Sequence, residues 1–413
     1  MKVIHTADIH LGQVIYQSYG RADEHSHFFS QLKGWCCSHR PDALLVSGDL
    51  FDIQQPGASA KEAFTRHFVD LIKACPGMAV IMIAGNHDSA SRLNADREIW
   101  EMNGVHIIGL PPSSDRSEGW QERYVVRLDC GYVVAFPYMT GDRREVIQSV
   151  LDMVARENDK GLPVFMMGHL AVAGADVTGH DLDIGTLKVQ KLEDLGSGYD
   201  YLALGHLHRP QTIGHPEDMY AEEASYPSGV VRYSGSPLHV SCDETYPHSV
   251  SLVQVDRHGG DVSVKQLKVS QYRHFHILPE DGSAFTDVDA ALAAIKAFAD
   301  EHGKGYFRLR MSYDTAVPSN FNQSVYELLA LYKDEVRYNP KTIWTGMPEK
   351  TEQPRPVFEV AELQQMTDPM TFVEKTKDQY PELDMEELRA AFDEVSEEVR
   401  RMKDSENGME AEQ

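Results

Sequence analysis

The chain has 413 residues, which is more than one hydrophobic core usually fills, so we expect two or three domains. Its formal net charge of −25 argues against a protein that grips nucleic acid through a basic surface of its own. The five cysteines lack metal-ligand spacing, which indicates a reducing compartment and no disulfide framework. The sequence has neither an apolar run long enough to span a membrane nor a signal peptide, and we expect a cytoplasmic protein.

The first two thirds of the chain alternate short apolar, β-rich runs with helical patterns. Strands are predicted at residues 2–7, 43–48, 79–84, 105–109, 162–168 and 200–205, and helices at 58–74, 91–102 and 142–158. This alternation predicts a layered α/β core. The segments 123–137 and 211–278 contain short alternating strands with polar breaks, which predict a second sheet packed on the first.

The pattern changes near residue 271. Strand, helix, strand, helix and strand are predicted at 274–278, 286–301, 306–313, 320–332 and 335–344, with Thr286 as the N-cap of the first helix. These elements predict a small α+β domain. Pro348, Pro354 and Pro356 lie among charged residues and predict a linker. The predicted domains are therefore 1–270, 271–345, the linker 346–358 and C-terminal helices in 359–413.

The C-terminal segment is acidic and amphipathic. Residues 351–413 carry 18 acidic and 7 basic side chains, which leaves −14 for the rest of the chain. An apolar stripe at helical spacing contains Leu388, Ala391, Phe392, Val395 and Val399. This face suits docking onto a basic partner, whereas the alternative is a helix that packs on its own domain.

Five short motifs carry metal-binding side chains in a fixed order. They are Asp8-Ile9-His10, Gly48-Asp49, Gly85-Asn86-His87-Asp88, Gly168-His169 and Gly205-His206-Leu207-His208. Nitrogen and oxygen ligands without thiolate suit Mn²⁺, Fe or Zn²⁺. Two such cations side by side clamp the attacking and leaving oxygens in a phosphoryl displacement. The motifs therefore predict a two-metal phosphoesterase.

Each candidate has an expected role. Asp8, His10 and His208 would hold the first cation, and Asn86, His169 and His206 the second, with the two oxygens of Asp49 bridging both. His87 is expected to act on the leaving group or the phosphoryl oxygens rather than to bind a metal. Asp52 is the candidate that orients His87, and Asp88 is the alternative. Any one motif alone is better explained as a capped turn or a core histidine, but five in order are not.

The motifs resemble the calcineurin-like metallophosphoesterase superfamily. Further segments, His-Leu-Gly-Gln at 10–13, Ile-Gly-Thr-Leu at 184–187 and Gly-Ser-Pro at 235–237, resemble the family of D subunits of bacterial SbcCD nucleases over residues 1–345. The resemblance implies a four-layer α-β-β-α sandwich with a small α+β cap domain and C-terminal helices. It also implies a homodimeric, Mn²⁺-dependent DNA nuclease that cuts duplex ends and hairpins.

The resemblance further implies a partner, an SMC-like coiled-coil ATPase that binds the C-terminal helices. The chain itself lacks a phosphate-binding loop, so ATP dependence would come from that partner. Arg21, Arg92 and Arg209 are candidate DNA-phosphate contacts. Phe64, Phe68 and Leu71 could form either core or dimer interface. Two other hypotheses stay open, namely a phosphodiesterase acting on a small or protein substrate and a non-catalytic scaffold.

Overall fold

The computed structural model describes residues 1–346, apart from 17, 114–116, 142, 178–188, 220, 241–243, 245 and 334, together with Arg389. Met1–Thr345 form one compact unit. The expected linker and C-terminal helices at 347–413 lie outside the described residues, Arg389 excepted. Among the described residues, no helix has the length and apolar character that crossing a membrane requires.

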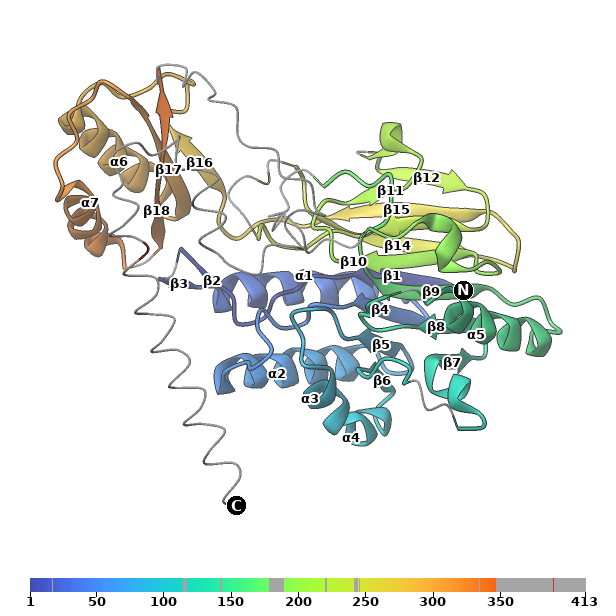
Figure 1. The fold of residues 1–413 in the computed structure, drawn as a ribbon. Helices are drawn as coiled ribbons and strands as arrows, with labels where there is room; N and C mark the ends of the chain where they lie inside the picture. The colour runs from blue at the N-terminus through green and yellow to red at the C-terminus, as the bar shows by residue number, and fades with distance from the viewer. Residues whose placement is uncertain are drawn as a thin grey trace. The chain divides into compact units, whose positions relative to one another are not determined.

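A seven-stranded sheet combines four strands from the first 108 residues with three from residues 223–268 (Figure 1). Its strands, in spatial order, are β12 (Glu223–Tyr226), β15 (Val262–Lys268), β14 (Ser249–Val255), β1 (Lys2–Thr6), β4 (Ala43–Ser47), β5 (Ala79–Ile83) and β6 (Val105–Ile108). The last four strands run parallel to one another, whereas β14 pairs antiparallel with β1. Parallel pairing brings the carboxyl ends of β1, β4 and β5 to one edge, where three of the motifs begin.

A six-stranded sheet supplies the other two motifs. Its strands, in spatial order, are β11 (Gln211–Thr212), β13 (Val230–Tyr233), β10 (Tyr201–Gly205), β9 (Val164–His169), β8 (Gly131–Ala135) and β7 (Val125–Leu128). The sheet assignment from the sequence was partly wrong, because β9 and β10 lie here while β12, β14 and β15 complete the first sheet. Local alternation identifies a strand, but its partner depends on which faces must be buried together.

The two sheets pack face to face between helices. Alternate residues of β1 point to opposite sides, so Val3 lies in the core between the sheets and Ile4 in the core beneath the helices. Helices α1 (Ala22–His39) and α2 (Ala58–Ala74) lie side by side and cover the seven-stranded sheet (Figure 1). Helix α5 (Arg144–Glu157) packs on the six-stranded sheet. The result is the expected α-β-β-α sandwich.

The helices differ from the sequence prediction in two places. Helix α1 was missed, although Phe28, Leu32 and Cys36 repeat at helical spacing and are buried. The single helix expected at 91–102 is two short helices, α3 (Ala90–Ala95) and α4 (Arg97–Glu101), separated at Asp96, whose ψ of 10° is not helical. The buried side chains of Phe64, Phe68 and Leu71 on α2 belong to the core of the sandwich, which confirms their interpretation as core.

The last fifth of the Met1–Thr345 unit has a hydrophobic core of its own. It contains β16 (Phe275–Leu278), α6 (Val288–His302), β17 (Gly305–Ser312), α7 (Phe321–Leu329) and β18 (Val336–Thr345), in the order that the sequence predicted. The N-cap of α6 is Asp287 rather than Thr286, because the Asp287 carboxylate accepts the amides of Asp289 and Ala290. A domain boundary at 270/271 stays a prediction.

The remaining elements are short. They are the β2–β3 pair (Val14–Ile15, Tyr19–Gly20) and the 3₁₀ helices η1 (Trp120–Tyr124), η2 (Leu192–Leu195), η3 (Pro216–Asp218) and η4 (Ala330–Tyr332).

Glu24 of α1 joins the β16–β18 sheet to the sandwich. Its Oε1 accepts hydrogen bonds from Tyr306 at 2.5 Å and from Arg337 at 3.1 Å, and it lies 3.4 Å from Nη1 of Arg273. Arg21 donates two further hydrogen bonds to Oε2 of the same carboxylate. A single buried carboxylate therefore contacts arginines from both parts, and Arg273 also pairs with Asp23 and Glu335, each at 2.6 Å.

Candidate metal centre

The motif residues meet where strand ends from both sheets converge. Asp8 and His10 follow β1, Asp49 follows β4 and Asn86 follows β5, whereas His169 ends β9 and His206 follows β10. Side chains at the carboxyl ends of packed α/β sheets commonly form ligand sites.

One group of ligand atoms surrounds His169. Its Nε2 lies 2.9 Å from Oδ1 of Asn86 and 3.3 Å from Oδ2 of Asp49. Nδ1 of His206 lies 3.0 Å from the same Asn86 oxygen. Nδ1 of His169 donates to the backbone carbonyl of Ser47 at 2.9 Å, which leaves the electron pair on Nε2 free for a metal. These atoms form a mixed nitrogen and oxygen donor set of the kind that Mn²⁺ or Zn²⁺ prefers.

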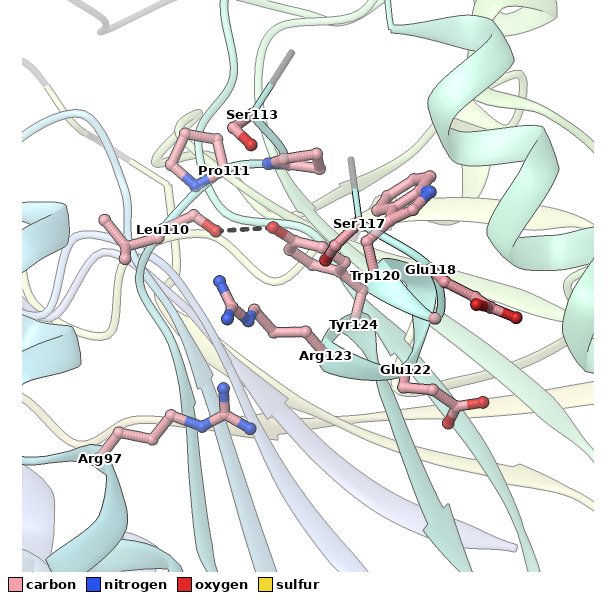
Figure 2. A pocket seen from close by; sticks show the side chains of 12 residues that line it. Arg97, Leu110, Pro111, Ser113, Ser117, Glu118, Trp120, Glu122, Arg123 and Tyr124 are labelled. Atoms are coloured by element: carbon pink, nitrogen blue, oxygen red, sulfur yellow. Dashed lines mark hydrogen bonds between the residues drawn. The ribbon is translucent and has the colours of Figure 1, made fainter. Parts of the chain in front are cut away.

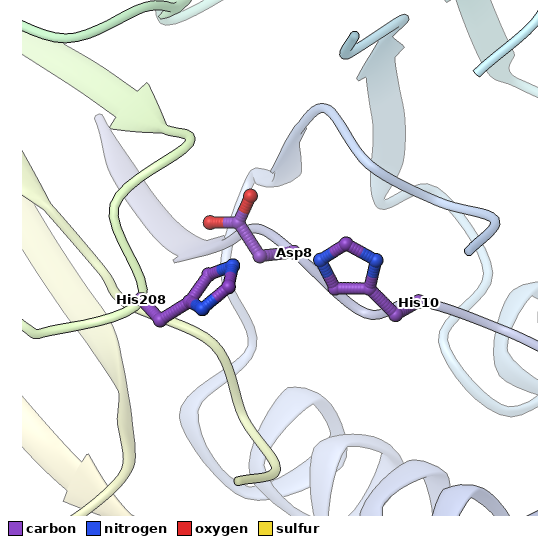
Figure 3. A group of neighbouring side chains, drawn as sticks. All are labelled: Asp8, His10 and His208. Atoms are coloured by element: carbon purple, nitrogen blue, oxygen red, sulfur yellow. The ribbon is translucent and has the colours of Figure 1, made fainter. Parts of the chain in front are cut away.

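A second group contains Asp8, His10 and His208, whose ligand atoms lie within 4.8 Å of one another (Figure 3). Nε2 of His10 is buried and makes no hydrogen bond among the described residues. It lies 4.0 Å from Oδ2 of Asp49, the oxygen that also faces His169. Asp49 therefore stands between the two groups, and the unsatisfied nitrogen of His10 suits a metal ligand.

The carboxylates of this cluster are buried, so their negative charge must be balanced by positive charge nearby. Burial raises the pKa of Asp8. Burial acts to lower the pKa of His169, but the Asp49 carboxylate raises it to about 9. Burial also favours a high pKa for Asp49, yet the surrounding histidines hold it well below the usual range. Protons on histidines thus neutralise the buried carboxylates here, and cations would do the same.

The backbone at the site is strained. The φ angles of Asp8, His10, Asp49 and His206 are 54°, 51°, 48° and 98°, in the region that favours glycine. Such conformations cost about 1–3 kcal/mol each and persist where the surrounding structure enforces them. We attribute them to the sharp turns that aim each ligand at the centre.

Glycines in the motifs allow the ligand loops to approach closely. A Cβ at Gly85 would lie 2.0 Å from Oδ1 of Asp49, and one at Gly205 would lie 2.0 Å from the carbonyl oxygen of Ser47. Neither distance leaves room for a side chain, so the glycine before each ligand is a packing requirement.

His87 differs from its neighbours because it is exposed. Its backbone amide donates to Oδ1 of Asp49 at 2.9 Å, and its Nδ1 donates to the backbone carbonyl of Asp52 at 2.7 Å. The expected contact between the Asp52 carboxylate and His87 does not form, because that carboxylate lies 3.3 Å from Nδ1 of His10 instead. Asp52 thus orients His87 through its main chain and contacts a metal-ligand candidate through its side chain.

Asp88, the alternative orienting acid, joins two ligand loops. Its carboxylate accepts the backbone amides of Leu50 at 3.1 Å, Phe51 at 2.9 Å and Gly85 at 2.9 Å. These bonds hold the segment after Asp49 against the segment that carries Asn86. Asp88 is buried, and burial together with Asp49 raises its pKa to about 6.

The three arginines proposed to contact DNA lie in different environments. Arg21 is buried, with its guanidinium bonded to Gln13, Glu24 and the carbonyl of His239, so it has no surface to offer a phosphate. Arg209 pairs with Asp176, and Arg92 is exposed. The sequence prediction for Arg21 was therefore wrong, since a buried arginine and a surface arginine look alike in a sequence.

A separate pocket lies away from the ligand cluster. It has a volume of about 570 Å³, is lined by Arg97, Trp120, Arg123 and Tyr124 among others, and contains none of the metal-ligand candidates (Figure 2). The chemistry predicted from the five motifs therefore lies outside this pocket.

Sequence reasoning missed residues that support the ligands. Glu244 lies 3.1 Å from Nδ1 of His208, and Nε2 of His25 donates to the carbonyl of Ile9, between Asp8 and His10. Nothing in the sequence distinguishes Glu244 from the chain's other acids. His25 stands one helical turn after Arg21, but its partner is a backbone group that a sequence does not single out.

A family model described as the calcineurin-like phosphoesterases matches residues 1–210. This chain belongs to that family. The matched half contains all seven metal-ligand candidates and His87. Membership makes the chain a metal-dependent hydrolase that acts on phosphoester bonds, and the four-layer sandwich is consistent with it.

Three curated relatives of the chain are each described as the D subunit of the nuclease SbcCD. The protein from Escherichia coli (strain K12) is 29% identical over 310 residues, which cover 69% of this chain and 72% of the relative. The Rhodobacter capsulatus protein is 27% identical over 319 residues, covering 69% of this chain and 73% of the relative. The Bacillus subtilis protein is 28% identical over 278 residues, covering 61% and 66%.

Proposed function

We propose that this chain is the nuclease component of a DNA-processing complex and that it hydrolyses DNA phosphodiesters with two divalent cations, for which we propose Mn²⁺. The observation that carries the proposal is the position of Asp49 between two ligand groups, with Oδ2 3.3 Å from His169 and 4.0 Å from His10. Family membership and the curated nuclease relatives support it.

Seven side chains would hold the cations. Asp8, His10, Asp49 and His208 would hold one, and Asp49, Asn86, His169 and His206 the other. When bound, two cations would clamp the attacking and leaving oxygens and lower the pKa of water. The neutral Asn86 oxygen adds a ligand without adding charge to the two buried carboxylates.

His87 would act on the substrate rather than on the cations. Its exposure lets it reach a bound phosphodiester, and its Nδ1 is held by the Asp52 carbonyl at 2.7 Å, so Nε2 is the nitrogen that can meet substrate. Protonated there, it would donate a proton to the departing 3′ or 5′ oxygen or hydrogen-bond a phosphoryl oxygen.

The finer activity is the one that the resemblance to SbcCD D subunits implies. We infer 3′–5′ exonuclease activity on duplex ends and endonuclease activity on single strands and hairpins, in DNA repair and recombination in the cytoplasm. An SMC-like ATPase would bind the C-terminal helices, the β16–β18 domain would contact DNA, and the chain would act as a homodimer. With a net charge of −25, the chain would depend on its cations and this partner to hold DNA.

The same charge favours one alternative, a phosphodiesterase acting on a small or protein substrate. Cleavage assays separate the two. Mn²⁺-loaded protein should cut a 3′-labelled blunt duplex and a hairpin, as well as bis-p-nitrophenyl phosphate. Hydrolysis of the small diester without DNA cleavage, even with the ATPase partner added, would favour the alternative.

The partner is tested by truncation after Met347. The shortened chain should keep Mn²⁺-dependent hydrolysis of the small diester, because every ligand candidate precedes the cut. It should lose binding to the coiled-coil ATPase in a pull-down. Unchanged binding by the truncated chain would refute the role given to the C-terminal helices.

A further inference from the structure

We propose that Glu244 is a positioning residue for the metal-ligand candidate His208 and that it sets the affinity of one cation of the pair. This inference rests on the proposed two-metal site. Glu244 lies outside the five motifs and outside the residues matched by the family model.

The contact between the two side chains determines which nitrogen of the His208 imidazole carries the hydrogen. Nδ1 of His208 lies 3.1 Å from Oε1 of Glu244, whose side chain is fully buried. A carboxylate only accepts, so Nδ1 carries the proton and donates it. The electron pair of the neutral ring is then on Nε2, the nitrogen left to join Asp8 and His10 at the cation.

The carboxylate of Glu244 is itself held in place. Its Oε2 accepts the backbone amide of Val240 at 3.0 Å and lies 3.5 Å from Nε2 of His248. Nδ1 of His248 lies 2.7 Å from the carbonyl of Ser236, and Nδ1 of His239 lies 3.0 Å from the carbonyl of Glu244. The Val240 amide holds the carboxylate and the His239 ring holds the main chain of the acid, so the carboxylate cannot turn away from His208 without losing the Val240 hydrogen bond.

The two cation groups therefore differ in how their histidines are oriented. Nδ1 of His169 donates to a neutral carbonyl, that of Ser47, whereas Nδ1 of His208 donates to a charged carboxylate. A carboxylate partner makes an imidazole a stronger electron donor than a carbonyl partner does. This contact therefore strengthens binding of the cation that His208 holds.

Titration of Mn²⁺ into the full-length protein tests this inference, with Glu244→Ala, Glu244→Gln and the surface control Glu222→Gln. Glu222 pairs with Lys268 at the surface and contacts none of the ligands. We expect Glu244→Ala to weaken one of two binding events by about 10–100-fold and to leave the other unchanged. Glu244→Gln should weaken the same binding event by less but still measurably, because its amide oxygen accepts the Nδ1 hydrogen whereas the negative charge that strengthens the imidazole is gone. The control should match wild type.

Electron paramagnetic resonance at low Mn²⁺ gives a second readout that does not depend on turnover. Wild type should show the spin-coupled signal of a Mn²⁺ pair, and Glu244→Ala the signal of an isolated ion. Wild-type affinity for both ions in folded Glu244→Ala would overturn the inference. If that variant does not fold, unchanged binding in Glu244→Gln would overturn it. A wild-type protein that binds fewer than two ions would instead refute the proposed function.

Discussion

Nε2 of His169 lies 3.3 Å from Oδ2 of Asp49, although His169 ends a strand of the six-stranded sheet and Asp49 follows a strand of the seven-stranded sheet. The two residues meet only because the sheets pack face to face. Binding of a cation between them therefore requires the packed sandwich, and the cation should in turn stabilise that packing.

Removal of metal should lower the stability of the protein. A ligand that binds only the folded state stabilises it by about 2.7 kcal/mol at a concentration one hundred times its Kd. We expect the melting temperature to rise with added Mn²⁺ and to fall after chelation, as measured by calorimetry. An Asp49→Asn variant should show a much smaller rise, and an equal rise in that variant would contradict the bridging role.

Gly85→Ala should disrupt the centre without a change in any ligand. The new Cβ would lie 2.0 Å from Oδ1 of Asp49, so the Asp49 or Asn86 loop must shift. We expect weaker Mn²⁺ binding and a large loss of phosphodiesterase activity. Gly34→Ala is the matched control, because a Cβ there meets nothing within 4 Å and α1 should gain about 0.5–1 kcal/mol.

His87→Ala should separate metal binding from turnover. The imidazole is exposed and its nitrogen is bonded to the Asp52 carbonyl, so we expect both Mn²⁺ ions to bind as in wild type. The turnover number should fall by about 10²–10⁴-fold, the usual contribution of general acid–base catalysis. Loss of one ion from this variant would mean that His87 is a ligand.

Glu24→Gln should affect cleavage of duplex DNA and hydrolysis of a small diester differently. The neutral side chain would leave Arg273 and Arg337 without their shared acid, and the β16–β18 sheet would be held less firmly on α1. We expect hydrolysis of bis-p-nitrophenyl phosphate to survive and duplex cleavage to fall. Equal loss of both activities would place the effect of Glu24 in the metal centre instead.

His25 should make stability depend on pH. Burial, together with Arg21, lowers the pKa of His25 to about 4, so between pH 6.5 and 4 the unfolded chain binds a proton that the folded chain does not. The free energy of unfolding should therefore fall as the pH drops through this window, by about 1.4 kcal/mol per pKa unit. His25→Gln should lack this part of the dependence when denaturant curves at pH 7 and pH 5 are compared.

The sequence predicted the strands and the convergence of the motif residues because both depend on local signals. Short apolar runs that end at Gly-Asp, Gly-Asn or Gly-His place ligands at strand ends, and parallel strands bring such ends together. Asp8, Asp49 and Asn86 could be grouped on that basis alone. The order of elements in 271–345 was also predicted, because hydrophobic periodicity changes with each element there.

The parts that could not be predicted depend on packing between distant segments. Strand β14 pairs with β1 although about 240 residues separate them in the sequence. No local pattern in either strand identifies the other as its partner. Glu244 contacts His208 from 36 positions further along the chain, and the Asp52 carboxylate turns to His10 rather than to His87. Arg21 is buried among groups from several segments of the chain. In the sequence it cannot be told apart from a surface arginine.

The proposed bridging of two cations by Asp49 can be seen in a crystal structure of the protein grown with Mn²⁺, with anomalous data collected near the manganese edge. We expect two anomalous peaks about 3.5–4 Å apart on either side of the Asp49 carboxylate, with His87 outside both coordination shells. A single peak, or a peak coordinated by His87, would contradict it.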